Sequence, residues 1–321
     1  MSCTALKSSS LPADAGAFWA GAFWAGAFRA RRKSRREETV GGQSARMKQR
    51  KRIFLPIVTF GFLLCLSASI LGCAAEPSRE YGVFLGIGGE QIDRLQDYRI
   101  VVIEPSEFQK EQIQELHETG KTVYGYLNIG ALEEYRPYYE RFKDTTLGIY
   151  EDWPDERWAD VSSPRWQSFV SDELGKQYAD MGIDGFFLDN ADVYHHYPTE
   201  DTFQGLCSIL RGLKAYNIPL LINGGDDFVS RCIEEGTALS LFDGVNQETV
   251  FTSIDFENES YGRQRETETV YFKDYLAKAR GCGLSVYLLE YGASPALENE
   301  IDGYCKENGF LWYNAEGLEL R

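Results

Sequence analysis

Short apolar runs alternate with longer amphipathic stretches through most of the chain. The apolar runs are rich in β-branched and aromatic residues and too short for helices, which is typical of strands buried on both faces. There are eight of them: Tyr81–Gly86, Arg99–Ile103, Thr122–Leu127, Gly185–Leu188, Pro219–Ile222, Gly244–Gln247, Ser285–Leu289 and Phe310–Tyr313. Such alternation predicts parallel strands joined by helical crossovers.

The stretches between the strands have the signals of helices. Ser106 can cap the first of them, and Pro164 suits the first turn of the second. The others alternate apolar and polar residues near the helical period. The predicted helices include Glu107–Thr119, Arg165–Met181, Thr199–Tyr216 and Thr269–Ala279.

Eight strands separated by helices predict a single (β/α)8 barrel, the TIM-barrel fold, over residues 80–321. The length of this segment is close to the roughly 250 residues typical of that fold. An open, doubly wound sheet is the alternative. That fold usually contains a G-x-G-x-x-G phosphate turn, which Gly86-Ile87-Gly88-Gly89 does not match.

One connection, residues 128–164, is longer than the others and rich in aromatic residues. Long loops on the catalytic face of a barrel often shape the substrate cleft. We expect most of these aromatic side chains to form a small core beneath the loop, and one or two to stack on sugar rings. The residues concerned are Tyr135, Tyr138, Tyr139, Phe142, Tyr150, Trp153 and Trp158.

The first 73 residues have a different pattern. Residues 1–46 contain repeated GAFWA pentamers and a basic run, and we interpret them as an upstream extension without a fold. From Met47, a basic segment precedes the apolar run Ile53–Leu71, which ends in Leu-Gly-Cys. Residues 47–73 therefore resemble a bacterial lipoprotein signal with a lipobox, in which Cys73 is lipidated. The alternative is a membrane-spanning anchor. Both place the domain outside the cytoplasm, and the first predicts an anchored lipoprotein at the cell surface.

Charge and composition exclude several classes of function. The formal net charge is −16, and twelve of the 33 basic residues precede Cys73, so the remaining chain is strongly acidic. Such a surface repels nucleic acid and could attract a cationic polymer, although solubility alone is an alternative reason for it. Three histidines and no C-x-x-C pair predict neither a zinc site nor a Ser-His-Asp triad, and we expect no cofactor and no metal.

Most predicted strands end at an acid or an amide. Because the carboxyl ends of barrel strands open onto one face, these side chains should gather there. Burying them unpaired would cost several kcal/mol, so we expect a water-filled cleft, although Asp and Asn also favour turns. The strand-end residues are Glu104, Asn128, Asp189, Asn190, Asn223, Gln247, Glu248, Glu290 and Asn314.

Two of these carboxylates suggest glycoside hydrolysis, which uses one acid and one nucleophile or base. We assign Asp189 as nucleophile or base, because the amide of Asn190 could keep it ionised. Glu248 has the longer reach and is assigned as the acid, with the exchange of the two roles as the alternative. Candidate substrate-binding residues are Tyr126, Asn128, Asn190, Asp192, Asn223 and Gln247.

Five segments resemble glycoside hydrolase family 114, the endo-α-1,4-polygalactosaminidases and their bacterial relatives. They are GKTVYGYLNIGALEEYR, GIDGFFLDNADVY, LLINGGDDF, GVNQETVFTSIDF and YLLEYG, and the likeness spans Tyr81 to Tyr313. The resemblance implies a (β/α)8 barrel that cleaves α-1,4-linked, galactosamine-containing polysaccharide. It also implies a catalytic pair at the positions of Asp189 and Glu248, with Glu290 as a further acid near the site.

The sequence therefore predicts a surface-anchored, monomeric glycoside hydrolase acting on an amino-sugar polysaccharide. If that substrate carries free amines, Asp192 and Glu290 could pair with its ammonium groups. The alternative is a non-catalytic, carbohydrate-binding lipoprotein on the same scaffold, since fold alone does not prove activity. A carboxyl separation of about 5–10 Å across an open cleft would favour the enzyme.

Overall fold

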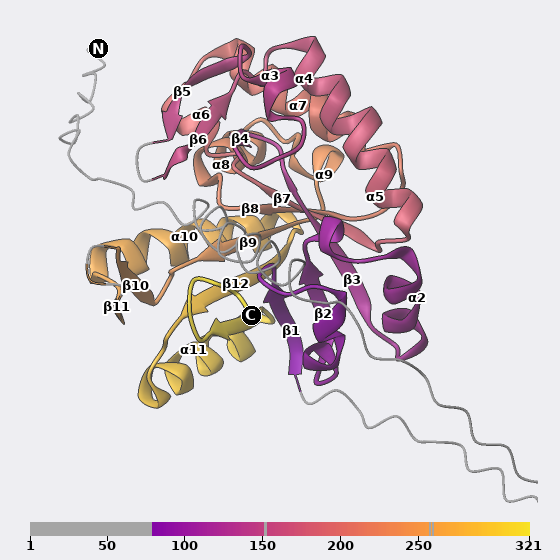
Figure 1. The fold of residues 1–321 in the computed structure, drawn as a ribbon. Helices are drawn as coiled ribbons and strands as arrows, with labels where there is room; N and C mark the ends of the chain where they lie inside the picture. The colour runs from indigo at the N-terminus through magenta and orange to yellow at the C-terminus, as the bar shows by residue number, and fades with distance from the viewer. Residues whose placement is uncertain (1–78, 151–152, 257, 259) are drawn as a thin grey trace, which may run out of the picture.

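The barrel strands form one parallel sheet. The computed structural model describes residues 79–321 apart from 151–152, 257 and 259 (Figure 1). The strands follow one another around the sheet in the order β1-β2-β3-β7-β8-β9-β12-β13. Their bounds are β1 Arg79–Phe84, β2 Tyr98–Ile103, β3 Thr122–Asn128, β7 Gly185–Asp189, β8 Leu220–Asn223, β9 Gly244–Glu248, β12 Ser285–Tyr291 and β13 Leu311–Ala315. Each overlaps a predicted strand.

The sheet curls into a nearly closed, TIM-barrel-like structure, because the first and last strands, β1 and β13, also contact each other. This confirms the predicted fold class. The strands are buried on both faces, as in β7, where Phe186, Phe187 and Leu188 are all inaccessible to solvent. Buried faces explain why the strands read as continuous apolar runs. The predictions for residues 1–46 and 47–73, including lipidation of Cys73, lie outside the described residues.

Helices lie around the outside of the strands (Figure 1). Their polar faces meet water and their apolar faces pack on the sheet. The longer ones are α2 Lys110–Glu118, α7 Glu200–Lys214, α8 Asp226–Glu234, α10 Glu266–Cys282 and α11 Pro295–Asn308. The short helices are α3 Tyr139–Phe142, α4 Pro164–Ser168, α5 Lys176–Met181, α6 Val193–His196 and α9 Ala238–Leu241, with 3-10 turns at Gly89–Leu95 and Pro105–Glu107. Among the described residues, none of these helices has the length and apolar character needed to span a membrane.

Two helix predictions need correction. Ser106 does not cap a helix at Glu107, because its backbone N–H donates to the side chain of Glu104 and the chain first makes a 3-10 turn. The helix α2 starts at Lys110, where Gln109 provides the cap. The predicted helix Arg165–Met181 is continuous, but its middle, Phe169–Gly175, is π-helical.

The long connection after β3 folds into a small antiparallel sheet, which we call the insert. It contains β4 Ala131–Glu133, β5 Thr146–Tyr150 and β6 Trp153–Ala159 in the order β4-β6-β5. Phe142, Tyr150 and Trp158 are buried, and Tyr150 stacks on Trp158, which confirms the expected aromatic core for these residues. A second antiparallel pair, β10 Thr252–Asp255 and β11 Ser260–Arg263, follows β9.

Candidate active site

The structure brings Asp189 and Glu248 together at the carboxyl ends of β7 and β9. Asn223, at the end of the intervening strand β8, lies between them. Its Nδ2 donates to Asp189 Oδ1 at 2.9 Å and to Glu248 Oε1 at 2.7 Å. The two accepting oxygens are therefore no farther apart than the sum of these distances. Residues separated by 59 positions in the chain thus share one amide group.

A directional chain of hydrogen bonds orients the bridging amide. Tyr81 Oη donates to Asn246 Oδ1 at 3.0 Å, and Asn246 Nδ2 donates to Asn223 Oδ1 at 2.7 Å. Because the Asn223 oxygen is occupied as an acceptor, its NH2 group faces the two carboxylates. Four neighbouring or facing strands, β1, β7, β8 and β9, contribute to this network.

Each carboxylate also accepts a hydrogen bond from a tyrosine. Tyr126 Oη donates to Asp189 Oδ2 at 2.9 Å, and Tyr291 Oη donates to Glu248 Oε2 at 2.6 Å. Every oxygen of the pair therefore has a donor. The two groups are held in matching surroundings, with one amide and one phenol each.

Burial changes the proton affinity of both groups. Asp189 and Glu248 are 0 % exposed. Burial raises the pKa of Asp189 to about 7, although the bonds from Asn223 and Tyr126 oppose this rise. Burial also raises the pKa of Glu248 well above its ordinary value, and the neighbouring Asp189 charge adds to the effect. Both groups can therefore hold a proton at a higher pH than exposed carboxyls do.

The water-filled cleft expected at the barrel mouth is not what surrounds these carboxylates. Their hydrogen-bond needs are met by amides and phenols instead of water, which offsets the cost of burying them. Asn190 contributes to holding Asp189 ionised, as expected, but less than Asn223 does. Its Nδ2 donates to Asp189 Oδ2 at 3.5 Å, its backbone bond lowers the pKa of Asp189, and the Asn223 bond is shorter at 2.9 Å. Asn190 also occupies a left-handed turn with φ of 66° that redirects the chain after β7.

Glu290 has different partners from the catalytic candidates. Its carboxylate accepts from the backbone N–H groups of Phe251 and Thr252, at 3.1 Å and 2.9 Å, and from Thr252 Oγ1 at 2.6 Å. Burial raises its pKa to about 7. These bonds hold the backbone that follows β9. We therefore reassign Glu290 from a catalytic or amine-binding acid to a positioning residue for that segment.

The remaining predicted ligands are mostly engaged in local structure. Asn128 Oδ1 accepts from the Ala131 backbone at 2.8 Å and shapes the entry into the insert. Asp192 Oδ1 accepts from Gly225 N at 2.8 Å, while its buried Oδ2 has no hydrogen-bond partner. Burial raises the pKa of Asp192 to about 8. Tyr126 and Asn223, expected to bind sugar hydroxyls, contact Asp189 directly.

Gln247 lies on the other side of β9 from the catalytic candidates. Successive side chains of a strand point to opposite faces, so Asn246 and Glu248 share a face and Gln247 does not. Its Nε2 donates to the Glu248 backbone at 3.2 Å. The prediction that Gln247 binds substrate in this site is therefore not supported, and the residue that strand alternation indicates is Asn246.

Sequence reasoning missed several residues around the pair. Strand alternation could have found Asn246, which lies two positions before Glu248. Tyr291 directly follows Glu290, and no pattern in the sequence distinguishes it from the other buried aromatic residues of the strands. Buried charges of the insert were also missed, and no local pattern predicts their strand pairing. These missed residues are Tyr81, Glu133, Arg136, Glu156, Asn246 and Tyr291.

Residues 73–315 match the profile of glycoside-hydrolase family GH114. The chain belongs to this family. The match confirms the resemblance noted from the five sequence segments, and it covers nearly all of the described barrel. In the GH114 fold of this chain, Asp189 and Glu248 are the two strand-end carboxylates joined by an amide.

Solved structures share the fold at low sequence identity. The glycoside hydrolase domain of PelA from Pseudomonas aeruginosa aligns with a TM-score of 0.63 and 17% identity, over 75% of this chain and 96% of that domain. Ega3 from Aspergillus fumigatus, in a complex with galactosamine, aligns with a TM-score of 0.59 and 19% identity, over 77% of this chain and 94% of Ega3.

A sequence relative is an uncharacterized protein of Deinococcus radiodurans. It is 25% identical over 210 residues, which are 61% of this chain and 65% of that protein. The chain thus matches slightly less than two thirds of this relative's length. Together, the profile and the structures establish the family and the fold.

Proposed function

We propose that this GH114 protein hydrolyses a galactosamine-containing polysaccharide, with Asp189 and Glu248 as its catalytic pair. The observation that carries the proposal is the shared Asn223 amide, which donates to both strand-end carboxylates. Two carboxyl groups at this distance match the requirement of glycosidic bond cleavage. Their burial supports proton chemistry, because a desolvated carboxyl can hold a proton near neutral pH.

The proton affinities of the two groups support the division of roles. Burial raises the pKa of Asp189 only to about 7, so an appreciable fraction is ionised at neutral pH. Burial and the neighbouring Asp189 charge raise the pKa of Glu248 well above its ordinary value, which suits a proton donor. Pairs whose proton affinities are pushed apart divide the roles of base and acid. Asp189 is therefore the nucleophile or base, and Glu248 the acid.

The separation of the pair favours a retaining reaction. Retaining enzymes hold their carboxyls about 5–5.5 Å apart, whereas inverting enzymes need roughly 6.5–9.5 Å to admit a water. The Asn223 bonds of 2.9 Å and 2.7 Å keep one oxygen of each carboxylate within the sum of these distances, which supports the shorter range. In this scheme Asp189 attacks the anomeric carbon while Glu248 protonates the leaving oxygen. Glu248 then removes a proton from the water that releases the sugar.

An amino-sugar polymer is the proposed substrate class. Ega3, which shares the fold, was solved with galactosamine. The acidic chain of this protein would attract a polymer bearing ammonium groups, and the family resemblance suggests α-1,4 linkages. We further propose, from the sequence of residues 47–73, that the protein is a monomeric lipoprotein held at the bacterial cell surface through Cys73.

The non-catalytic alternative is a carbohydrate-binding protein. The complete burial of both carboxylates favours it, because a substrate must reach these groups for hydrolysis. Catalysis would require side chains or loops above the pair to move on binding. The two functions differ in one measurable result, which is the production of new chain ends.

The decisive experiment incubates the purified protein with de-N-acetylated galactosaminogalactan and with a panel of cell-wall polysaccharides. Reducing ends are measured over time, and proton NMR of the first product gives the anomeric configuration. We expect new reducing ends from the amino-sugar polymer, with retained configuration. An absence of new ends from every polymer, with binding intact, would favour the carbohydrate-binding alternative. Inverted configuration would overturn the retaining scheme alone.

A further inference from the structure

Two buried glutamates face each other in the insert. Glu133 on β4 and Glu156 on β6 are direct cross-strand partners in the antiparallel pair. Their exposures are 0 % and 2 %. Like charges directly opposite on neighbouring strands destabilise a sheet. A buried pair of acids at such a position therefore requires an explanation beyond the folding of the insert.

Each of these carboxylates has an unused oxygen. Glu133 Oε1 accepts from Arg136 Nη2 at 3.0 Å and from Tyr135 Oη at 3.4 Å. The Oε2 atoms of both Glu133 and Glu156 are buried and have no hydrogen-bond partner. Buried polar atoms normally have partners, because leaving them unpaired is costly. Two buried acceptors without a hydrogen-bond partner thus lie on facing residues.

Positive charge is also scarce around this pair. The buried Arg136 is shared, since its Nη2 also donates to Glu104 Oε2 at 3.1 Å. In the described part of the chain, no lysine or arginine forms an ion pair with Glu156. Burial and then the neighbouring Glu133 and Asp189 raise the pKa of Glu156 well above its ordinary value. A cationic ligand would supply the charge that the protein lacks here.

The insert is rooted beside the catalytic pair. The backbone N–H of Ile129, just before β4, donates to the carbonyl of Asp189 at 3.0 Å. Gly130 packs so closely that a Cβ there would come within 1.8 Å of Asn190 O. After burial itself, the charges of Asp189, Glu133 and Glu156 all raise the pKa of Tyr126, whose hydroxyl bonds Asp189. The charges of these three carboxylates therefore all act on Tyr126.

We propose that Glu133 and Glu156 bind the ammonium group of an amino sugar next to the catalytic pair. The inference rests on the proposed function and assigns its amine recognition to the insert. An ammonium carries three N–H donors and no acceptor, which matches two facing carboxylate oxygens without partners. An N-acetylated sugar offers one amide N–H and no charge, so it leaves an acid unpaired. The insert would thus favour de-N-acetylated polymer.

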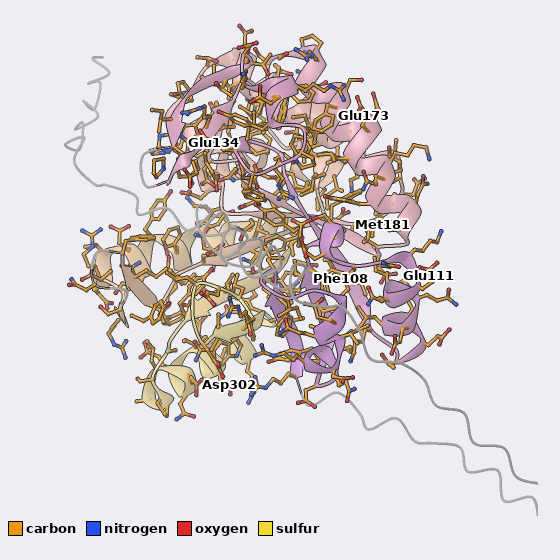
Figure 2. All side chains as sticks on the ribbon, in the orientation of Figure 1. Phe108, Glu111, Glu134, Glu173, Met181 and Asp302 are labelled. Carbon is orange, nitrogen blue, oxygen red and sulfur yellow. The ribbon has the colours of Figure 1, made fainter. Side chains whose placement is uncertain are left out.

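The test compares Glu156→Gln with a matched control, Glu134→Gln. Glu134 neighbours Glu133 in sequence but is exposed, and it bonds Arg157 on β6 (Figure 2). KM and kcat are measured on de-N-acetylated and on N-acetylated galactosamine polymers. We expect Glu156→Gln to raise KM for the de-N-acetylated polymer about tenfold, the size of one lost charge-assisted hydrogen bond. The KM for the N-acetylated polymer, and both values for Glu134→Gln, should stay unchanged.

A second measurement keeps the inference separate from catalysis. Galactosamine and N-acetylgalactosamine are titrated calorimetrically into wild type and Glu156→Gln, and Glu133→Gln replaces the latter if it does not fold. The ammonium site would be supported if wild type binds galactosamine but not N-acetylgalactosamine and the variant loses this binding. This result would hold even if wild type cleaves neither polymer and the proposed function fails. The proposed ammonium site would be overturned if wild type and Glu156→Gln had equal KM values for the de-N-acetylated polymer. Equal binding of galactosamine by these two proteins would also overturn it. The acids would then be a structural pair that shares a proton.

Discussion

Glu248 and Glu290 end neighbouring strands and are equally buried, but they are held by different kinds of partner. Glu290 accepts from backbone N–H groups and one hydroxyl of the segment that it supports. Glu248 accepts only from the side chains of Asn223 and Tyr291, which belong to the network around Asp189. A carboxylate bound by backbone holds a chain segment in place, whereas one bound by side chains can exchange partners with a substrate. Burial and a raised pKa occur in both, so they do not by themselves identify a catalytic acid.

The largest expected difference is in activity. Asp189→Asn and Glu248→Gln should each lower kcat about 10³-fold or more, because each removes a group that takes part in bond breaking or proton transfer. Glu290→Gln should lower kcat by less than about tenfold, since it acts through the chain that it positions. Initial rates of reducing-end release measure all three, and circular dichroism confirms folding. Equal losses in Glu290→Gln and Glu248→Gln would remove the distinction between these two glutamates.

Asn223→Ala should have the next largest effect. The substitution removes one hydrogen bond to each carboxylate, and bonds to charged groups contribute roughly 1.5–3 kcal/mol. We expect kcat to fall about 10- to 100-fold. Because the Asn223 bond lowers the pKa of Asp189, its loss should also shift the acidic limb of the kcat/KM profile from about 7 to higher pH.

Asn314→Ala is the matched control for that variant. Asn314 also lies at a strand end, but it bonds Ala293 and Glu298 instead of the catalytic pair. Its pH profile should match that of wild type. If the pH profile of kcat/KM is also unchanged in Asn223→Ala, the Asn223 bond does not affect the pKa of Asp189.

The two glutamine variants should rank in the opposite order when stability is measured instead of activity. Glu290→Gln places an amide N–H2 against backbone donors, so we expect the free energy of unfolding to fall by about 1–3 kcal/mol. Glu248→Gln keeps one acceptor oxygen, and its partners are side chains that can rotate to suit the new amide. The substitution also removes a buried acid, so the free energy of unfolding should fall by less than in Glu290→Gln. Urea unfolding at pH 7 measures both. A larger loss in Glu248→Gln would contradict the positioning role of Glu290.

A further expected effect is the dependence of stability on pH. The pKa values of Asp189 and Glu290 are raised to about 7, and that of Asp192 to about 8. Groups with a raised pKa bind protons more tightly in the folded state. Their contribution is complete below the ordinary carboxyl pKa of about 4 and is lost as the pH rises through 7 to 8. The free energy of unfolding should therefore fall between pH 5 and pH 8.

Asp192→Asn tests that pH dependence and keeps both members of the catalytic pair in place, although the Asp192 charge that raises the pKa of Glu248 is removed. The neutral amide removes one titrating group, so the variant should lose less stability over the same range, by about 1 kcal/mol or more. Urea midpoints at each pH give the comparison. A stability that rises with pH in wild type would show that these buried groups are ionised in the fold.

Local patterns in the sequence determined the barrel and the positions of the pair. Short apolar runs predicted all eight strands, because strands buried on both faces cannot afford polar residues in their interiors. Parallel strands present their carboxyl ends to one face, so Asp189 and Glu248 could be placed in one region from their strand-end positions. The family resemblance rested on the same segments.

Only the tertiary structure decided the partners of each carboxylate. The curvature of the barrel places Asn223 between Asp189 and Glu248, and the segment after β9 occupies Glu290. The register of β4 and β6 sets Glu133 opposite Glu156. These contacts join residues that are distant in the chain, and their geometry depends on how the strands pack. The chemistry of a buried acid depends on its donors and neighbouring charges, which no local pattern specifies.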